Sequence, residues 1–569
     1  MTDTEDRLEN PSANEQKAAL INSDEQLKTK APDGRLTMPL FFAVFAATVG
    51  GSFQFGYHIG CVNAPEKIIT EWYKKSYNEM NGKIMTHEAA EFAWSISVGI
   101  FAVGGMIGAL MSGWLADKIG RKGALLANNV IAFVGAILMT SSKYAGVYYL
   151  LTIGRFLIGV NSEQRSGLSV GRRFKSCHGS YLFHIHNSLA IRMRWRVKRH
   201  HLELRAAALG LNSGLVPMYV TEISPPNLRG AIGSVCQLLV TIAILTSQIL
   251  GLPFIFGNEQ RWPFIFAFSI VPIAIMLICL PLCAESPNYN LIVKGRKEQA
   301  EKDLIKFRGT ENVAVELEII DEEAKASRSQ AQVTFGDMFG AALRWPLFIA
   351  IMMMLAQQLS GINATMFYST KIFREAGLPG NGPVYATIAM GAINVVQTLV
   401  SVWLVDHPKF GRRSLMLAGM IGMFIAAVLT SISLTLVSQK NAVGETKHQW
   451  ASYAAIVFVL LFVVAFATGP GSIPWFYVSE IFPSNARGKA NSLACMSNWL
   501  ANFVVAVSFP AINGVLKHFT FLVFAGLLAF FIIFTYKFVP ETKNKSVEEI
   551  QRAMSTSNRA PASQNVTHA

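Results

Sequence analysis

Nine asparagine and glutamine side chains lie within long apolar segments of this chain. Polar side chains are costly inside a membrane and are usually kept there for a function. A carboxamide both donates and accepts hydrogen bonds without a charge to desolvate, which matches the hydroxyls of a polyol. A lone Asn or Gln more often joins two helices, but nine together favour a binding site for an uncharged, hydroxyl-rich solute. They are Gln54, Gln237, Gln248, Gln357, Gln358, Asn363, Asn394, Asn498 and Asn502.

Two tryptophans accompany these carboxamides along the chain. Trp475 and Trp499 present flat apolar faces that can cover a sugar ring. Immediately before Trp475, the segment Gly469-Pro-Gly471 and Pro474 predict a broken helix, because Pro and Gly interrupt the helical hydrogen-bond ladder. A break at this point would allow part of the helix to move.

The elements that must position these residues are membrane helices. The 569 residues are 51% hydrophobic and only 15% charged, with a mean hydropathy of +0.35, whereas soluble proteins carry about a quarter charged residues. About 20 apolar residues cross a bilayer. We therefore predict an all-α membrane protein with twelve transmembrane helices. Eleven candidate spans lie near 38–62, 93–116, 124–142, 231–254, 263–283, 345–372, 383–405, 414–437, 452–478, 490–515 and 519–539, and a twelfth lies in two pieces, 147–161 and 209–224.

The segment between those two pieces, residues 162–209, is atypical. It holds ten Lys or Arg and only two acidic residues, so it cannot lie in the hydrocarbon core. Without it, the flanking pieces form one uninterrupted helix, the fourth. One interpretation is an aberrant insertion, from a retained intron or a wrong gene model. The other is a real basic loop that contacts anionic lipid. A nucleic-acid-binding patch is the weaker alternative.

Positive charge indicates the orientation of the chain. The net charge is +14, and the basic residues gather in the loops after every second helix, which predicts that both termini are cytoplasmic. This pattern is typical of a multi-pass membrane protein and argues against a nucleic-acid partner. The basic loops contain Lys118–Lys122, Arg229, Lys294–Arg308, Lys409–Arg413, Arg487–Lys489 and Lys537–Lys545.

The chain also repeats itself. Glu222–Gly230 matches Glu480–Gly488, and Asp117–Lys122 resembles Asp406–Arg413. Such duplication is typical of transporters that bind their solute between two repeats. We expect a cytoplasmic tail (1–37), a six-helix half (38–284, including the insertion 162–209), a helical linker (285–340), a second six-helix half (341–540) and a C-terminal tail (541–569).

The repeated charges predict a cytoplasmic gate, since Arg pairs carboxylates at helix ends and breaking such pairs lets the halves part. Solvated surface pairs of little energetic value are the alternative interpretation. The predicted gate residues are Asp117, Arg121, Glu222 and Arg229 in one half, and Asp406, Arg412, Arg413, Glu480 and Arg487 in the other.

An ordered set of motifs carries a family resemblance. From about residue 38 to 545, outside the insertion, the chain resembles the facilitative glucose transporters, in the sugar-porter branch of the major facilitator superfamily. The motifs are Gly113-x-x-x-Asp117-x-x-Gly120-Arg121-Lys122, Gly154-Arg155, Glu222 to Gly230, Gln357 to Asn363, Gly469 to Trp475, Ser497-Asn-Trp499 and Pro540-Glu-Thr-Lys543.

This resemblance implies facilitative transport of a hexose, D-glucose first, across the plasma membrane by alternating access, with no enzymatic activity, cofactor or metal. The implied sugar hydrogen-bonding residues are Gln237, Gln357, Gln358, Asn363, Asn394 and Asn502. Trp475 is implied to close the site, and Phe55, Val240, Ile244 and Phe466 to line it.

Several departures from the family pattern leave alternatives open. Ala467 replaces a usual glutamate, and Met354-Leu-Ala356 replaces the sequence of glucose-selective members, so fructose stays possible. His58, which the resemblance places near Arg155, could titrate and couple transport to protons, although we expect it to be neutral. A non-transporting sugar sensor and an inactive splice product are the remaining alternatives.

Overall fold

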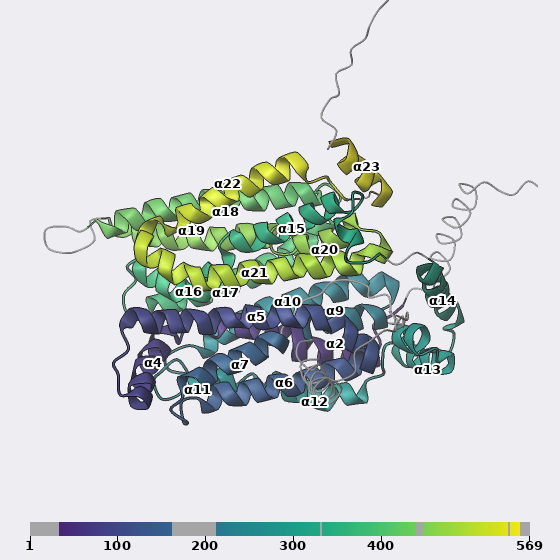
Figure 1. Cartoon of the computed structure of the whole chain (residues 1–569), viewed down its shortest axis with the longest axis horizontal. Coiled ribbons are helices and arrows are strands. Elements are labelled where there is room, and N and C mark those ends of the chain that lie inside the picture. Colours follow the sequence, from purple (N-terminus) through teal and green to yellow (C-terminus); the bar gives the residue numbers. More distant parts are fainter. Residues whose placement is uncertain are drawn as a thin grey trace, which may run out of the picture.

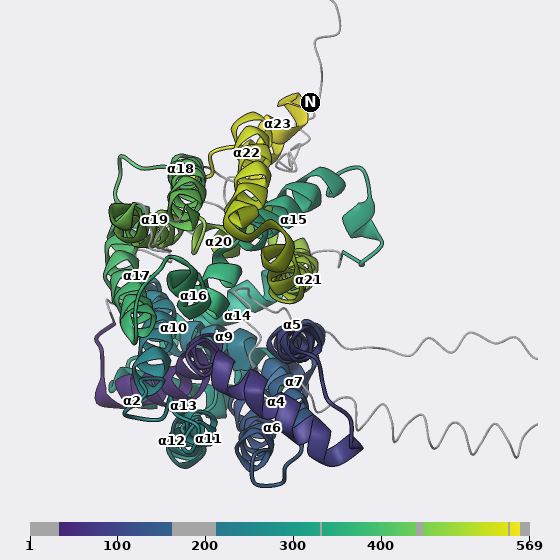
Figure 2. The same cartoon turned by 90° about the vertical axis from the view of Figure 1, so that its left-hand side faces the viewer.

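A computed structural model describes residues 34–161, 212–329, 333–439, 448–543, 545 and 547–557. All regular elements in these ranges are helical. The helices pack into two bundles, one below the other in Figure 2. The N-terminal bundle contains α2 (Met38–Thr48), α3 (Gln54–Gly60), α4 (Glu66–Asn81), α5 (His87–Ile119), α6 (Arg121–Ser141), α7 (Tyr148–Asn161), α9 (Asn212–Ile223), α10 (Arg229–Leu250), α11 (Pro263–Ala267) and α12 (Ile270–Cys279).

The C-terminal bundle follows two shorter helices, α13 (Lys297–Arg308) and α14 (Ala314–Ser329). These two lie at one end of the bundles, which we call the linker end, and α4 lies at the opposite end, the far end (Figure 1). The C-terminal bundle contains α15 (Arg344–Leu359), α16 (Ile362–Glu375), α17 (Gly382–Asp406), α18 (Arg412–Ser438), α19 (Gln449–Thr468), α20 (Ile473–Ile481), α21 (Ser484–Leu516) and α22 (Thr520–Phe538), and α23 (Val547–Ser557) follows it.

Ten segments of the described residues are long and apolar enough to cross a membrane. The longest of them, Asn485–Phe538, contains both α21 and α22. The predicted fourth transmembrane helix falls on α7 and α9, and the atypical segment 162–209 between them lies outside the described residues. Both α7 and α9 pack against α5 and α6. The two side chains Asn128 and Asn161 donate to each other's backbone carbonyls at 3.1 Å, which fixes α7 against α6.

Two helix breaks lie at the centre of the C-terminal bundle. Gly361 separates α15 from α16 with a φ of +93°, a conformation that favours glycine. A Cβ at this position would lie 2.5 Å from the ring of Phe524, so no side chain fits. As predicted from Gly469-Pro-Gly471, α19 ends at Thr468 and α20 begins at Ile473. The break between α19 and α20 leaves the carbonyls of Pro470 and Gly471 free to accept hydrogen bonds from a side chain of α15.

The bundles meet along two pairs of helices. Helix α5 packs against α21, and α10 packs against α17. The first of these pairs runs along the boundary between the bundles in Figures 1 and 2. The polar side chains of Gln358 on α15, Asn363 on α16 and Asn498 on α21 are buried in the interior.

Candidate functional site

A chain of carboxamides crosses the interior of the C-terminal bundle. Gln358 donates to Asn498 at 2.9 Å and accepts from Asn363. Asn498 donates to Gln357 at 2.8 Å. Gln357 in turn donates to the carbonyls of Pro470 and Gly471 at 2.9 and 2.7 Å, in the break between α19 and α20. The four side chains are nine-tenths or more buried, so the structure connects the predicted sugar-binding glutamines to the helix break.

Three other predicted hydrogen-bonding residues lie on the helices that form the seam between the bundles. Asn394 on α17 and Asn502 on α21 are buried, and Gln237 on α10 is half-buried. The side-chain amide oxygen of Asn502, Oδ1, is buried and accepts no hydrogen bond from the described residues. A buried acceptor without a partner costs about 1–3 kcal/mol, and a ligand hydroxyl could satisfy it.

Aromatic rings from both bundles meet beside these amides. Trp499 on α21 makes edge-on contacts with Phe55 and Phe101 of the N-terminal bundle, with ring centroids 6.0 and 5.8 Å apart. A Cβ at Gly105 would lie 2.7 Å from the Trp499 ring, so glycine allows this close packing of α5 on α21. The Trp499 indole N–H is buried and donates to no described residue. The ring therefore combines an apolar face with an unused donor, which is what a sugar ring requires.

The remaining predicted lining residues surround the same region. Trp475 on α20 is half-buried, and Phe466 on α19 contacts the helix break. Val240 and Ile244 are buried on α10. Gly56 and Gly60 of α3 lie so close to α10 that a Cβ at either would meet the backbone of Val240 or Ile244 within 3 Å. These two apolar residues thus hold α3 against α10, besides any contact with a solute.

His58 and Arg155 are joined through the backbone. Arg155 donates to the carbonyl of His58 at 2.8 Å and to the carbonyls of Ser97 and Val98 at 3.2 and 3.3 Å. Its guanidinium also lies 4.8 Å from the ring centroid of Phe101. Both residues are fully buried. The carbonyl dipoles and the ring face of Phe101 therefore stabilise the charge of Arg155.

The charged motif of the N-terminal bundle forms a compact network at the linker end. Arg121 contacts Glu222 through Nε and Nη2 at 3.0 and 3.1 Å and Asp117 through Nη1 at 3.3 Å. Glu222 also accepts from the Ser286 hydroxyl. Arg229 donates to the carbonyl of Ser224 at 3.3 Å, which caps the turn before α10. Each of these contacts joins two residues of the N-terminal repeat and its following loop.

The C-terminal bundle repeats this network. Arg412 lies 3.5 Å from Glu480, whose carboxylate accepts from the Thr542 hydroxyl. Arg487 donates to the carbonyl of Phe482 at 3.3 Å, as Arg229 does to Ser224. Arg413 donates to the carbonyl of Tyr536. Asp406 ends α17, and its side chain lies outside the described part of the chain.

Two glutamates that the sequence analysis did not assign to the gate complete the networks. Glu285 accepts from the backbone N–H of Lys122 at 3.0 Å, and Glu541 accepts from those of Arg412 and Arg413 at 2.7 and 3.1 Å. Each carboxylate lies at a helix N-terminus, where the helix dipole favours an anion. Burial raises the pKa of Glu285, and the hydrogen bonds from Lys122 and Ser286 oppose that shift. The sequence does contain a sign of these two residues, because Glu285-Ser286 and Glu541-Thr542 stand at matching positions at the ends of the two halves.

Comparisons with known proteins give the family. The chain matches the family described as "Sugar (and other) transporter" over residues 43–168 and 204–554. The chain belongs to this sugar transporter family. The unmatched residues 169–203 fall inside the atypical segment 162–209. The resemblance to facilitative glucose transporters is thereby confirmed, and this member of the family is a transporter and not an enzyme.

Relatives of this sugar transporter family member include two facilitated glucose transporters. It is 53% identical over 520 residues to facilitated glucose transporter protein 1 of Caenorhabditis elegans, which covers 91% of each chain. It is 38% identical over 520 residues to the facilitated glucose transporter member 3 of solute carrier family 2 from Canis lupus familiaris, covering 91% of this chain and 93% of that protein. The inward-open xylose transporter XylE of E. coli shares the fold, with a TM-score of 0.65, 24% identity, and 90% of this chain and 99% of that chain covered.

Proposed function

We propose that this protein is a uniporter that carries hexose, D-glucose first, across the plasma membrane. The observation that supports this most directly is the carboxamide chain through Asn363, Gln358, Asn498 and Gln357, which ends at the carbonyls of the helix break. It supplies both donors and acceptors without a net charge, so it suits hydroxyls rather than ions. The printed names of the C. elegans and dog relatives agree with glucose as the solute.

The proposed topology has twelve transmembrane helices with both termini in the cytoplasm. It follows when α7 and α9 are counted as one helix and α21 and α22 as two. Under this topology the linker end faces the cytoplasm and the far end faces outside. The basic residues of the linker-end networks, such as Arg121 and Arg412, support this orientation by the positive-inside rule.

The proposed mechanism is alternating access. The solute binds between the bundles, among Trp499, Asn502 and the amides of α15, and the bundles then rock so that the site opens to the other side. In this scheme the charged networks hold each bundle's linker-end helices together while the bundles move. They act as the cytoplasmic gate because the tips of those helices move apart as rigid units.

The proposal is tested by uptake of labelled hexoses in cells that lack their own hexose carriers. We expect saturable uptake of D-glucose, competition by other hexoses that fit the site, and no uptake of L-glucose. Uptake that stays at background for every hexose, in cells that display the protein at their surface, would refute the proposed function. Sugar binding without uptake would instead identify a sugar sensor.

Proton coupling is the second candidate, because a histidine lies beside a buried arginine. The XylE structure bound to 6-bromo-6-deoxy-D-glucose is named as a proton:xylose symporter, although it shares only the fold. Against coupling, Arg155 contacts only the backbone carbonyl of His58 in this pair. We therefore expect glucose uptake to continue after a protonophore is added, and His58→Asn to keep it. Uptake that collapses with the protonophore would establish a symporter.

The same assay tests the atypical segment. We expect the full chain to be impaired in folding or insertion, because a block of ten cationic residues interrupts the fourth helix. A chain without residues 162–209 is expected to reach the surface in larger amounts and to transport more per cell. Equal uptake by the two chains would show that the segment is a tolerated loop.

A further inference from the structure

An ion pair joins the two bundles at the far end. Lys371, in the last turns of α16, lies 2.9 Å from Glu91, in the second turn of α5. Neither residue belongs to a motif that the sequence analysis assigned to a gate. The side chains are 20% and 33% exposed, so the pair is screened only in part and still reaches water.

Hydrogen bonds from Asn63 hold the same part of α16. The Asn63 amide donates to the carbonyl of Met366 at 2.8 Å and to the Ser369 hydroxyl, and its oxygen accepts from the backbone N–H of Thr370 at 3.0 Å. Asn63 follows α3 in the N-terminal bundle and is fully buried. The far end of the structure is therefore closed by direct contacts between the bundles.

The contrast with the linker end is marked. Glu91 and Asp117 lie on the same helix, α5, roughly 40 Å apart along its axis, so the two sets of charges lie at opposite faces of the bundle. The ion pairs described at the linker end, Arg121 with Glu222 and Arg412 with Glu480, each join residues of one bundle. The pair of Lys371 and Glu91 instead joins residues of different bundles.

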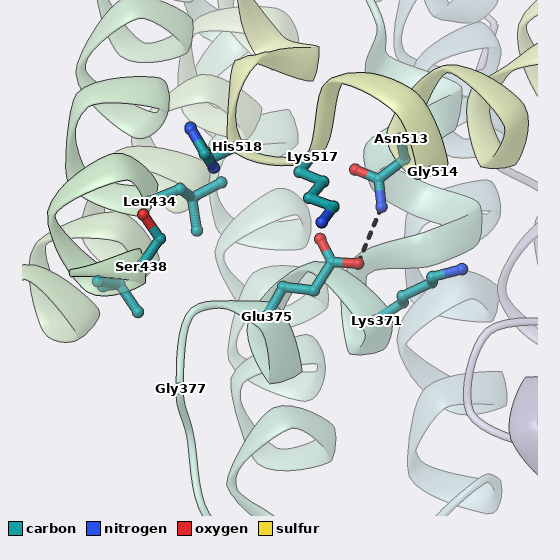
Figure 3. Close-up of a pocket in the computed structure, with 10 residues that line it drawn as sticks. Lys371, Glu375, Gly377, Leu434, Ser438, Asn513, Gly514, Lys517 and His518 are labelled. Carbon is teal, nitrogen blue, oxygen red and sulfur yellow. Dashed lines mark hydrogen bonds between the residues drawn. The ribbon is translucent and has the colours of Figure 1, made fainter. Parts of the chain in front are cut away.

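A cavity of about 530 Å³ opens beside this contact, and Lys371 and Glu375 line it. Figure 3 shows the Glu375 carboxylate turned toward Asn513, with which it forms a hydrogen bond of 2.8 Å, while Lys371 extends away from this pair. Glu375 thus forms its hydrogen bond within the C-terminal bundle, whereas Lys371 forms its ion pair with Glu91 of the other bundle. A cation that borders an open cavity can regain water when the bundles part, which makes the contact reversible.

We propose that Lys371 and Glu91 form a far-end gate, an ion pair that must break each time the binding site opens on that side. This inference rests on the proposed transport by alternating access. In the inward-facing arrangement the pair is formed, and it separates when α16 moves away from α5. Loss of either charge shifts the carrier toward the state that is open at the far end.

Cys61 provides a native reporter for the state of the gate. This thiol is buried two residues before Asn63, whose side chain contacts α16 of the other bundle. We expect Cys61 to become accessible when that contact breaks. Intact cells are treated with a membrane-impermeant maleimide from outside, and the labelled peptide is identified by mass spectrometry. We expect Lys371→Gln and Glu91→Gln each to raise the rate of Cys61 labelling about fivefold, the effect of a modest ion pair.

A matched control and a charge exchange separate gating from general damage. Lys74 pairs with Glu71 at 2.9 Å within the single helix α4, at the same end of the molecule, so Lys74→Gln should leave labelling unchanged. The double variant Glu91→Lys with Lys371→Glu restores an ion pair in which the two charges have exchanged positions. It is expected to return Cys61 labelling to the level of the unaltered chain, which a merely structural role would not predict.

The outcomes distinguish this gate from the proposed function. Single variants that label at the unaltered rate, or a charge exchange that fails to restore protection, would overturn the gate even if hexose uptake is normal. Labelling that responds as expected in a chain that carries no hexose would support the gate and refute the proposed substrate. Since labelling needs no sugar, the two results are read independently.

Discussion

The carboxylate of Glu285 accepts the backbone N–H of Lys122, and so it lies against the N-terminus of α6. Glu541 has the same relationship to the N-terminus of α18. Both contacts depend on a preceding glycine. A Cβ would lie 2.3 Å from the Glu285 carboxylate at Gly120 and 2.0 Å from the Glu541 carboxylate at Gly411.

Alanine at either glycine should therefore destabilise the protein. Gly120→Ala is expected to cost more than Gly411→Ala, because Gly120 also has a φ of +92°, and such strain costs about 1–3 kcal/mol. The loss of stability is measured in detergent as the temperature at which half of the monodisperse size-exclusion peak is lost. Gly123→Ala is the control, since its Cβ would meet only ordinary contacts at 3.7 Å or more. Equal stability of Gly120→Ala and Gly123→Ala would contradict the assigned role of Glu285.

The two repeated arginines should differ in importance. Arg121 and Glu222 are 3% and 6% exposed, whereas Arg412 and Glu480 are 16% and 27% exposed and lie 3.5 Å apart. Removing one partner of a buried pair costs about 3–5 kcal/mol, and an exposed pair contributes about 0–1 kcal/mol. We expect Arg121→Gln to reduce the amount of folded protein at the surface much more than Arg412→Gln does. A larger loss for Arg412→Gln would show that burial does not set the ranking.

Gln358 should determine sugar affinity. Gln358 bonds to both Asn498 and Asn363 in the carboxamide chain. Gln358→Ala therefore disorders these two neighbours and also removes the hydrogen bond that Gln358 is proposed to make with the sugar. We expect the half-saturation concentration for glucose to rise about tenfold, equivalent to roughly 1.4 kcal/mol. Gln397→Ala is the matched control, because Gln397 on α17 bonds to the Thr468 hydroxyl at the end of α19 and forms no hydrogen bond with the carboxamide chain among the described residues. A similar change in both variants would remove Gln358 from the site.

The far-end gate should respond to pH through Glu66. Burial raises the pKa of Glu66 to about 7, the charges of Lys371 and Arg374 lower it, and those of Glu91 and Glu375 raise it. Glu66 is partly exposed in the closed state, and opening the far end exposes it more fully to water, where its pKa is about 4.3. The closed state thus binds a proton that the open state releases, so closure is favoured as the pH falls below about 7.

This linkage predicts that Cys61 labelling decreases as the external pH is lowered from about 7.5 to 5.5, by up to tenfold per pH unit. Glu66→Gln should remove the part of that dependence that Glu66 contributes, since an amide does not titrate. His87→Gln tests the other titratable neighbour of the gate, because His87 Nε2 lies 3.7 Å from Glu91. The labelling rate of a small thiol in the same buffers corrects for the pH dependence of the maleimide reaction itself. An unaltered pH profile in Glu66→Gln would exclude Glu66 as the titrating group.

Sequence patterns were sufficient for an all-helical membrane fold and for the break between α19 and α20, but not for the break at Gly361, which lies inside the predicted span 345–372. Long apolar segments separated by basic loops identify membrane helices, and the break between Thr468 and Ile473 follows directly from the chemistry of Gly and Pro. The linker-end residues were also recognisable, because Arg121 and Arg412 recur at equivalent positions of a repeated motif. Repetition makes such residues visible in a single sequence.

The far-end contact could not be predicted in this way. Glu91 and Lys371 are 280 residues apart, belong to no repeat, and lie next to other charged residues that make different contacts. Only the packing of α5 against the C-terminal bundle brings them together. Likewise, the hydrogen-bonded order of Gln357, Gln358 and Asn498 depends on how α15 faces α21, which a helical period alone does not give.

The far-end ion pair has a kinetic consequence. A carrier whose bundles are tied together by Lys371 and Glu91 at the far end spends most of its empty time facing the cytoplasm under the proposed topology. Its half-saturation concentrations for influx and efflux should then differ, and a sugar already inside should accelerate the return of the empty site. No accumulation follows from this imbalance, because the gradient of sugar alone still sets the final concentrations on the two sides.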